Sequence, residues 1–200
     1  MSVSELSTST QNYLKAIWGL KEWSSEPVTA TLIAKQLGLK LSSVSDAVRK
    51  MAKQGLVSHT PYGSVELTEL GRQYALVMVR RHRLLESFLV QALDYTWDEV
   101  HNEAENLEHA VSDMLIERVD KFLDYPTRDP HGDPIPTVDG QITIPSAHRL
   151  TDSGAQSQVT VERISDSDPQ LLAFLKEQGI VIGAVLATRE GTPFSESLEV

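Results

Sequence analysis

The sequence predicts a mainly α-helical chain with small β elements. Apolar residues recur at helical spacing in several segments, and polar capping residues precede these segments. Two short β-like runs flank a Pro/Gly turn near residue 62, which is the pattern of a hairpin. Between residues 126 and 145, five prolines and two glycines interrupt the helical pattern. Such a stretch cannot continue a helix, so we expect a linker there and a different structural region after it.

Two helices are expected before residue 40. The first begins near Thr8, where Thr8 and Gln11 form a capping-box pattern. Its apolar side consists of Tyr13, Leu14, Ile17 and Leu20. After Pro27 interrupts this pattern, a short helix over Thr31–Leu37 should end at Gly38, a suitable residue for a left-handed C-terminal cap.

A third helix should follow almost at once, from Ser42 or Ser43 to Gln54, and stop at Gly55. Its residues with helical spacing and apolar character are Val44, Ala47, Val48 and Met51. They predict one buried stripe. The runs Leu56–His59 and Ser64–Leu67 then predict the two strands of the hairpin.

Two long helices are expected next. Thr68 should cap the first, which runs to about Leu93, and the Thr96/Glu99 capping box should open the second, which runs to about Leu123. Beyond the Pro-rich stretch, the sequence predicts a strand, a helix and a strand over Gln158–Ile164, Leu171–Gln178 and Val181–Leu186.

Composition limits the possible functions. The chain has no cysteine, so thiolate metal sites, disulfides and cysteine catalysis are excluded, and any metal must be held by nitrogen and oxygen. No apolar run approaches the ~20 residues of a membrane span and no signal peptide is recognisable, so we expect a cytoplasmic protein without membrane partners. The net charge is −10, but residues 1–75 carry eight Lys/Arg against six Asp/Glu, which leaves this part free to approach phosphates.

Two short helices, a hairpin and a long helix form the order of a winged helix-turn-helix, whose second helix enters the major groove of DNA. Opposite the apolar stripe of that helix lie small hydroxyl and basic side chains, suited to base and phosphate contacts. The candidate DNA-binding residues are Lys40, Ser42, Ser43, Ser45, Asp46, Arg49 and Lys50, with Tyr62 in the wing tip Thr60–Ser64. The alternative is a small helical bundle with a solvated polar face.

The two long helices carry a set of metal-ligand side chains. His82 and Glu86 are spaced i, i+4 on the first of them. On the second, the spacing i, i+4, i+7, i+8 places on one face His101, Glu105, Glu108 and His109. Imidazole with carboxylate suits Mn²⁺, Fe²⁺ or Zn²⁺, and a larger share of oxygen favours Mn²⁺. The alternative is a solvated acidic face with incidental histidines.

These residues resemble the diphtheria-toxin-repressor family over essentially the whole chain. The most similar segments are Asn12–Trp18, Val44–Gly55, Arg80–Glu86, Val100–Asp113 and Arg128–Pro136. The resemblance implies a winged helix-turn-helix DNA-binding domain (1–75), a helical dimerisation and metal-binding domain (76–125), a Pro-rich linker (126–157) and an SH3-like domain (158–200). That last domain ends at Val200 before such a fold should be complete, so we expect it to be partial.

The resemblance also implies two metal sites per subunit. The primary site would use Asn12, Glu105, Glu108 and His109. The ancillary site would use His82, Glu86 and His101 with an acidic side chain of the C-terminal domain, for which Asp166 is preferred and Asp168 is the alternative. Iron-responsive members have Cys where Glu105 stands, so Glu105 favours Mn²⁺ over Fe²⁺, Co²⁺ or Zn²⁺. Manganese sensors usually have Asp at position 12, whereas Asn12 offers an uncharged oxygen.

The resemblance therefore implies a manganese-dependent repressor that binds a palindromic operator as a homodimer, with the long apolar helix Leu84–Leu93 available for pairing, and controls metal uptake genes. The alternatives are an iron-responsive repressor of the same family and a winged-helix regulator that senses an organic ligand. A di-metal carboxylate enzyme is disfavoured because the His82 and His109 segments lack the Glu-x-x-His pairs of that class. We expect neither catalysis nor a small-molecule substrate.

Overall fold

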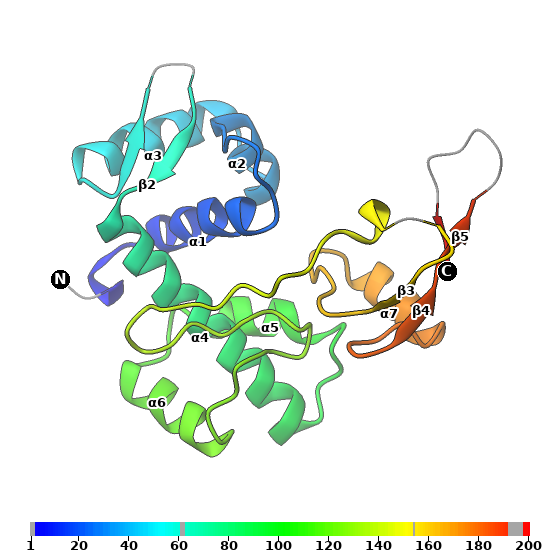
Figure 1. The fold of residues 1–200 in the computed structure, drawn as a ribbon. Helices are drawn as coiled ribbons and strands as arrows, with labels where there is room; N and C mark the ends of the chain where they lie inside the picture. Colours follow the sequence, from blue (N-terminus) through cyan, green and yellow to red (C-terminus); the bar gives the residue numbers. More distant parts are fainter. Residues whose placement is uncertain (1–2, 61–62, 154, 192–197) are drawn as a thin grey trace. The chain divides into compact units, whose positions relative to one another are not determined.

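The structure is a computed structural model that describes residues 3–60, 63–153, 155–191 and 198–200. The chain divides into two compact units. Figure 1 shows its helices and strands with colours that follow the sequence. The first unit comprises residues 1–82 and 136–141, and the second comprises residues 83–135 and 142–200. Helix α4 (Glu69–Leu93) begins in the first unit and ends in the second. The mainly helical class with small antiparallel sheets is confirmed.

The first unit has the order of a winged helix-turn-helix. A short 3-10 helix η1 (Val3–Glu5) precedes three α-helices, which are α1 (Thr8–Glu22), α2 (Ala30–Leu37) and α3 (Leu41–Lys53). Strands β1 (Val57–His59) and β2 (Val65–Leu67) then pair antiparallel, with Val57 opposite Leu67. The apolar stripe of α3 is buried as expected, since Val44 and Val48 are completely inaccessible. This stripe packs in one core with residues of α1, α2, β2 and α4.

The ends of these helices are set by local contacts. Gly38 has the left-handed backbone expected of a C-cap, with φ 64°. Thr68 Oγ1 accepts from the Gly71 N–H at 3.1 Å, which confirms the predicted start of α4. The predicted Thr8/Gln11 capping box is wrong. Ser7 caps α1 because its hydroxyl oxygen accepts from the Thr10 N–H. The Gln11 amide instead donates to the carbonyls of Val3 and Leu6.

The second unit contains the end of α4, followed by α5 (Val100–Leu107) and α6 (Asp113–Phe122). The prediction of one continuous helix to Leu123 is wrong. The Thr96 hydroxyl does donate to Glu99 at 2.7 Å, but α5 ends at Leu107 and Ser112 caps a new helix by accepting from Leu115 N–H. The core of this unit contains Leu84, Leu85 and Leu89. The expectation that Leu84–Leu93 is available for pairing is therefore wrong for these three leucines, which are at most 3% exposed.

The later part of the second unit has little regular structure. It contains η2 (Leu150–Asp152), α7 (Pro169–Glu177) and the antiparallel pairs β3 (Gln158–Thr160) with β4 (Val185–Ala187) and β5 (Arg189–Glu190) with β6 (Leu198–Glu199). The predicted strands are thus present but shorter. Within the Pro-rich stretch, residues 131–136 are buried in a tight turn around Gly132, whose φ is 84°. Across the described ranges, no helix has the length and apolar character that crossing a membrane requires.

Candidate metal centre and nucleic-acid interface

Three predicted ligand residues of the second unit meet at one point. Glu86 comes from α4, His101 from the first turn of α5, and Asp166 from the segment between β3 and α7. His101 Nδ1 lies 2.9 Å from Asp166 Oδ2 and 3.4 Å from Glu86 Oε1. Glu86 is completely buried, and His101 and Asp166 are about a quarter exposed. An imidazole nitrogen and two carboxylate oxygens therefore converge within the second unit.

The charges of this cluster explain the behaviour of His101. Burial alone would lower the pKa of this imidazole, but hydrogen bonds and charge from Asp166 and Glu86 raise the pKa to about 10. Without a metal, the ring is therefore an imidazolium between two carboxylates. The same donors, once the ring has lost its proton, fit a divalent cation that prefers nitrogen and oxygen ligands.

His82, the fourth predicted ancillary ligand, lies in the first unit, where α4 places it one turn before Glu86. It is 6% exposed, and its Nδ1 lies 3.4 Å from the Lys15 ammonium of α1. The two candidates for the acidic ligand differ in their surroundings. Asp168 accepts from the N–H groups of Gln170 and Leu171 and so caps α7, whereas Asp166 faces His101.

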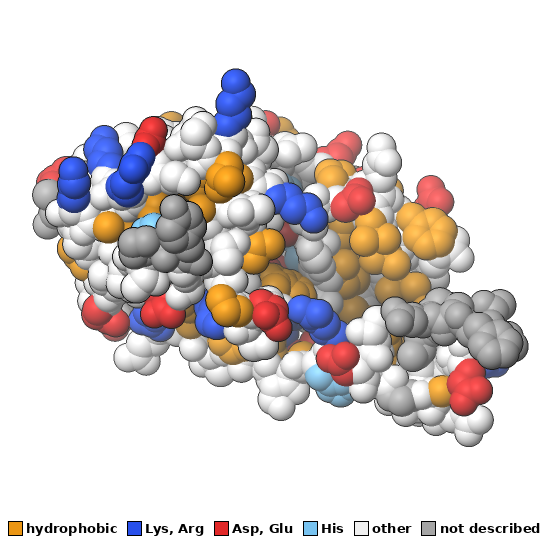
Figure 2. All heavy atoms as spheres, turned by 90° about the horizontal axis from the view of Figure 1, so that it is seen from above, with side chains coloured by type: hydrophobic (Ala, Val, Ile, Leu, Met, Phe, Trp, Pro, Cys, Tyr) orange, Lys and Arg blue, Asp and Glu red, His pale blue; other side chains and the backbone are white. Residues whose placement is uncertain are grey.

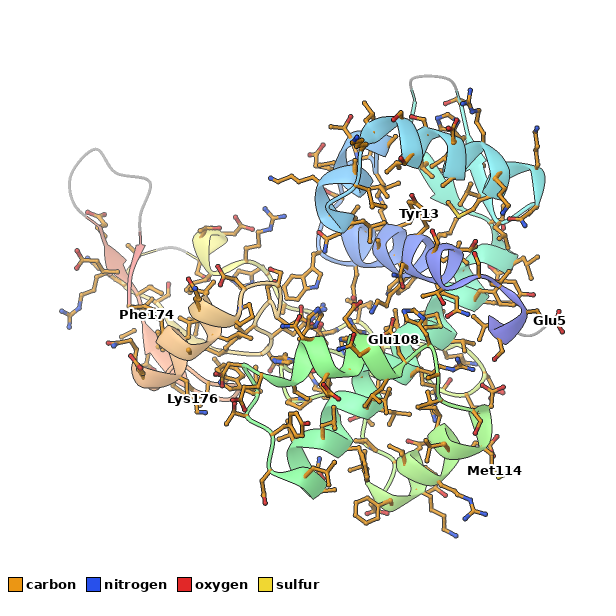
Figure 3. The ribbon with its side chains drawn as sticks, turned by 180° about the vertical axis from the view of Figure 1, so that it is seen from behind. Glu5, Tyr13, Glu108, Met114, Phe174 and Lys176 are labelled. Atoms are coloured by element: carbon orange, nitrogen blue, oxygen red, sulfur yellow. The ribbon has the colours of Figure 1, made fainter. Side chains whose placement is uncertain are left out.

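The predicted primary-site residues of the second unit lie at the C-terminal end of α5. Glu105 Oε1 is 3.9 Å from His101 Nε2, on the same helix. Glu108, which is labelled in Figure 3, is completely buried and directly follows the last residue of α5. Its Oε1 lies 3.5 Å from His109 Nε2. Because α5 ends at Leu107, Glu108 and His109 belong to the following turn rather than to the expected continuous helical face.

Asn12 lies on α1 in the first unit. Its side-chain oxygen is buried, yet no donor among the described residues lies within hydrogen-bonding distance of it. A buried acceptor that lacks a hydrogen-bond donor costs about 1–3 kcal/mol of stability. A partner other than a hydrogen-bond donor would offset this cost. A metal ion is one such partner, because an amide oxygen is a suitable ligand for a hard cation.

A polar cluster beside Glu86 was not predicted from the sequence. His131, which is completely buried, places Nδ1 3.8 Å from Glu86 Oε2 and Nε2 2.7 Å from the Trp97 carbonyl. Burial alone would lower the pKa of His131, but Glu86, Asp129 and the Trp97 carbonyl raise it to about 9. Burial raises the pKa of Asp129, and the negative charges of Glu86 and Asp133 add to this effect. The available signal was a concentration of charged residues inside the Pro-rich stretch.

Most predicted DNA-binding residues are accessible on one side of α3. Lys40, Ser42, Ser43, Asp46, Arg49 and Lys50 are exposed, and Ser45 is half-buried. Arg49 forms an ion pair with Asp46 on the helix surface. Figure 2 shows basic side chains interspersed with acidic ones on the face that includes the first unit. Tyr62, the predicted wing-tip contact, lies outside the described residues.

The first unit also contains an apolar cavity of about 240 Å³. It lies between α1, the loop before α2, β2 and the start of α4, and its lining includes Ile17, Trp18, Val28 and Leu67. Arg72 lies over the Trp18 ring at 5.5 Å.

Comparison with known proteins gives concordant matches. Residues 5–65 match the iron-dependent repressor N-terminal DNA-binding domain, and residues 68–137 match the iron-dependent repressor metal-binding and dimerisation domain. The iron-dependent repressor IdeR of Mycobacterium tuberculosis is 36% identical over 203 residues, which cover 96% of this chain and 87% of that protein. The diphtheria toxin repressor of Corynebacterium diphtheriae is 35% identical over 137 residues, which cover 68% of this chain and 60% of that repressor.

Similar solved structures include manganese-dependent proteins. A manganese-dependent transcriptional repressor in complex with manganese has a TM-score of 0.87 and 51% sequence identity, and the match covers 90% of this chain and 83% of that one. The manganese regulator SloR has a TM-score of 0.80 and 35% identity, and the match covers 94% of this chain and 87% of that one.

Proposed function

The chain belongs to the iron-dependent repressor family, also called the diphtheria-toxin-repressor family, whose members are transcriptional repressors rather than enzymes, and on this premise we propose that it represses transcription in response to Mn²⁺. The observation that carries the metal part of the proposal is the convergence of Glu86, His101 and Asp166. We assign these residues, with His82, to an ancillary metal site. The match of residues 5–65 to the DNA-binding domain of the family supports the DNA-binding part of the proposal.

We assign the primary site to Asn12, Glu105, Glu108 and His109. The buried oxygen of Asn12 and the buried carboxylate of Glu108 support this set, since both atoms are suitable ligands shielded from water. A bound divalent ion would neutralise the carboxylates and fix their positions. Glu105 supplies oxygen where a thiolate would favour softer ions, so the donor set favours Mn²⁺ over Fe²⁺, Co²⁺ or Zn²⁺. The 51% identity to a manganese-dependent repressor supports the same metal.

The repressor is proposed to bind a palindromic operator as a homodimer. Helix α6 supports dimer formation because its exposed side chains include Met114, Leu115 and Phe122, with 65%, 45% and 65% of their surfaces accessible. Figure 3 shows Met114 on the outer side of this helix. Exposed apolar side chains on one helix are typical of a protein–protein interface. On each subunit, α3 would supply the base and phosphate contacts.

The test is operator binding by the full chain, measured by gel shift after chelation and during titration with Mn²⁺, Fe²⁺ and Zn²⁺. We expect EDTA to abolish the shifted band and Mn²⁺ to restore it at the lowest free concentration. Strong binding in EDTA would contradict the proposal. It would favour instead a winged-helix regulator whose organic ligand occupies the apolar cavity beside Trp18.

A further inference from the structure

Glu86 faces two imidazoles with its two carboxylate oxygens. Its Oε1 lies 3.4 Å from His101 Nδ1, and its Oε2 lies 3.8 Å from His131 Nδ1. Of these two histidines, only His101 belongs to the ligand set proposed above. His131 faces the other carboxylate oxygen and, like Glu86, is completely buried. The second oxygen of Glu86 therefore lies at ion-pair distance from a histidine outside that set.

The His131 ring is itself held in one orientation. Its Nε2 donates to the Trp97 carbonyl at 2.7 Å, and its plane stacks on the Trp97 indole with the centroids 5.8 Å apart. The His131 backbone N–H donates to Asp129 Oδ1 at 2.9 Å. Because both the ring and the backbone are fixed, Nδ1 has little freedom to move away from Glu86.

The same turn also holds the segment that leads to Asp166. The His131 carbonyl accepts from Ile164 N–H at 3.0 Å, two residues before Asp166. Arg163 hydrogen-bonds Asp133, and Arg128 pairs with Glu162 at 2.9 Å. The contact is tight at Gly132, where an added Cβ would lie 2.1 Å from the Glu162 carbonyl oxygen. The turn and the segment 162–164 are therefore closely packed.

A metal ion bound by Glu86, Asp129 and His131 is a competing interpretation, since their ligand atoms lie within 4.8 Å of one another. The surroundings of Asp129 disfavour it. Asp129 Oδ1 already accepts from the backbone N–H groups of His131 and Asp133, and Oδ2 lies 3.6 Å from the Arg83 guanidinium. A second cation beside Arg83 would be repelled.

We propose that His131 is a positioning residue of the ancillary metal site, whose ring orients the Glu86 carboxylate and whose carbonyl anchors the segment carrying Asp166. This inference rests on the assignment of Glu86, His101 and Asp166 as metal ligands. Residues that hold metal ligands in place typically change metal affinity about 10- to 100-fold when they are replaced. His131 holds one ligand by its side chain and a second through its backbone, so a side-chain substitution tests the first contact alone.

The test is a double-mutant cycle between His131→Phe and Glu86→Gln in the full chain, measured by calorimetric titration with Mn²⁺. Phe keeps an aromatic ring against Trp97 but lacks both nitrogens. We expect His131→Phe alone to lower the affinity of one Mn²⁺ site about 10- to 100-fold, and to have little further effect when Glu86 is already Gln. Absorption spectra with Co²⁺ should change in the single variant, because the ligand geometry changes. The matched control is His148→Phe, at an exposed histidine that contacts Ser153, and it should bind Mn²⁺ like the wild type.

Replacement by Asn supplies a second test, because the Asn amide nitrogen can stand where His Nδ1 stands. His131→Asn should recover part of the affinity lost in His131→Phe, and an Asn variant no better than Phe would overturn the proposal. Additive losses in the cycle would also overturn it, since His131 would then not act through Glu86. If Glu86→Gln weakens Mn²⁺ binding while His131→Phe does not, only this inference fails. If Glu86→Gln itself leaves Mn²⁺ binding unchanged, the ancillary site and this inference both fail.

Discussion

His101 Nδ1 and Asp166 Oδ2 lie 2.9 Å apart, although one residue begins α5 and the other lies between β3 and α7. The contact joins the helical part of the second unit to the segment that follows the Pro-rich stretch. Because His101 also faces Glu86, the position of Asp166 determines whether two carboxylates or only one share the imidazole. The proposed ancillary site therefore depends on a contact between segments distant in sequence.

Asp166→Asn should lower the affinity of one Mn²⁺ site. Loss of a residue that only holds a ligand in place lowers metal affinity roughly 10- to 100-fold, and loss of a direct ligand should lower it by at least as much. The amide retains the size of the side chain but removes its charge. Asp168→Asn is the matched control, because Asp168 caps α7 and does not face His101. Calorimetric titration should show weaker Mn²⁺ binding only in the first variant. Equal effects of the two substitutions would contradict the assignment of Asp166.

Features set by neighbouring residues in the sequence could be predicted, whereas features set by contacts between distant segments could not. The end of α2 and the start of α4 follow from Gly38 and Thr68, which act on their own helix ends. Ser112 also acts locally, but the helical pattern of residues on both sides of it concealed the break between α5 and α6.

The role of His131 could not be predicted in the same way. Its contacts are with Glu86 and Trp97, and both result from the packing of the Pro-rich turn on α4 and on the residues before α5. Neither periodicity nor capping patterns carry information about such packing. Asp166 could be proposed only from the family resemblance, which left Asp168 as the alternative, and the structure shows Asp168 capping α7 while Asp166 faces His101.

Glu105→Cys should change the metal preference of the repressor. A thiolate is a softer ligand than a carboxylate, so the variant should require less Fe²⁺ or Co²⁺ than the wild type for the same operator binding, and more Mn²⁺. The measurement is a gel shift at controlled free metal concentrations under reducing, anaerobic conditions. Glu103→Cys, a change to the same residue type on the same helix, serves as the control. An unchanged order of metals in Glu105→Cys would remove Glu105 from this role.

Metal binding at the ancillary site should release protons. The pKa of His101 is raised to about 10 by Asp166 and Glu86 despite the opposing effect of burial, so the ring carries a proton at pH 7.5 in the metal-free chain. Coordination requires the neutral ring, and Mn²⁺ affinity should therefore rise with pH up to about 10. Calorimetry in buffers of different ionisation enthalpy measures the protons released. A binding enthalpy independent of the buffer would contradict this expectation.

Phe122→Glu should weaken the proposed dimer. Phe122 is 65% exposed on α6, and burial of a Phe side chain contributes roughly 1.5–3 kcal/mol, which corresponds to about 10- to 150-fold in dimer affinity for each of the two copies in the dimer. Analytical ultracentrifugation should show more monomer in this variant. Phe174→Glu provides the control, since Phe174 is similarly exposed, at 55%, but lies on α7. A dimer disrupted by Phe174→Glu and not by Phe122→Glu would place the interface elsewhere.

Asn12 is expected to couple metal binding to DNA binding. It lies on α1 in the first unit, whereas the other proposed primary ligands lie in the second unit, at the end of α5 and in the turn that follows it. A metal ion bound by residues of both units shifts the population towards the DNA-competent arrangement, by as much as it binds that arrangement more tightly. Asn12→Ala should therefore lower operator affinity at saturating Mn²⁺ more than it lowers Mn²⁺ affinity, because the remaining three ligands still bind the ion.

Asn12→Asp should have the opposite effect. It adds a negative charge to the oxygen that already lies buried without a described donor, so it should strengthen both Mn²⁺ binding and operator binding. Lys15, the nearby cation on α1, lies 3.4 Å from His82 Nδ1. Calorimetry with Mn²⁺ and operator binding at saturating Mn²⁺ should be compared for wild type and both variants, with Gln73→Ala, an exposed amide on α4, as the control. If Asn12→Ala binds the operator with wild-type affinity at saturation, residue 12 is not the coupling ligand, and the two units communicate through another contact.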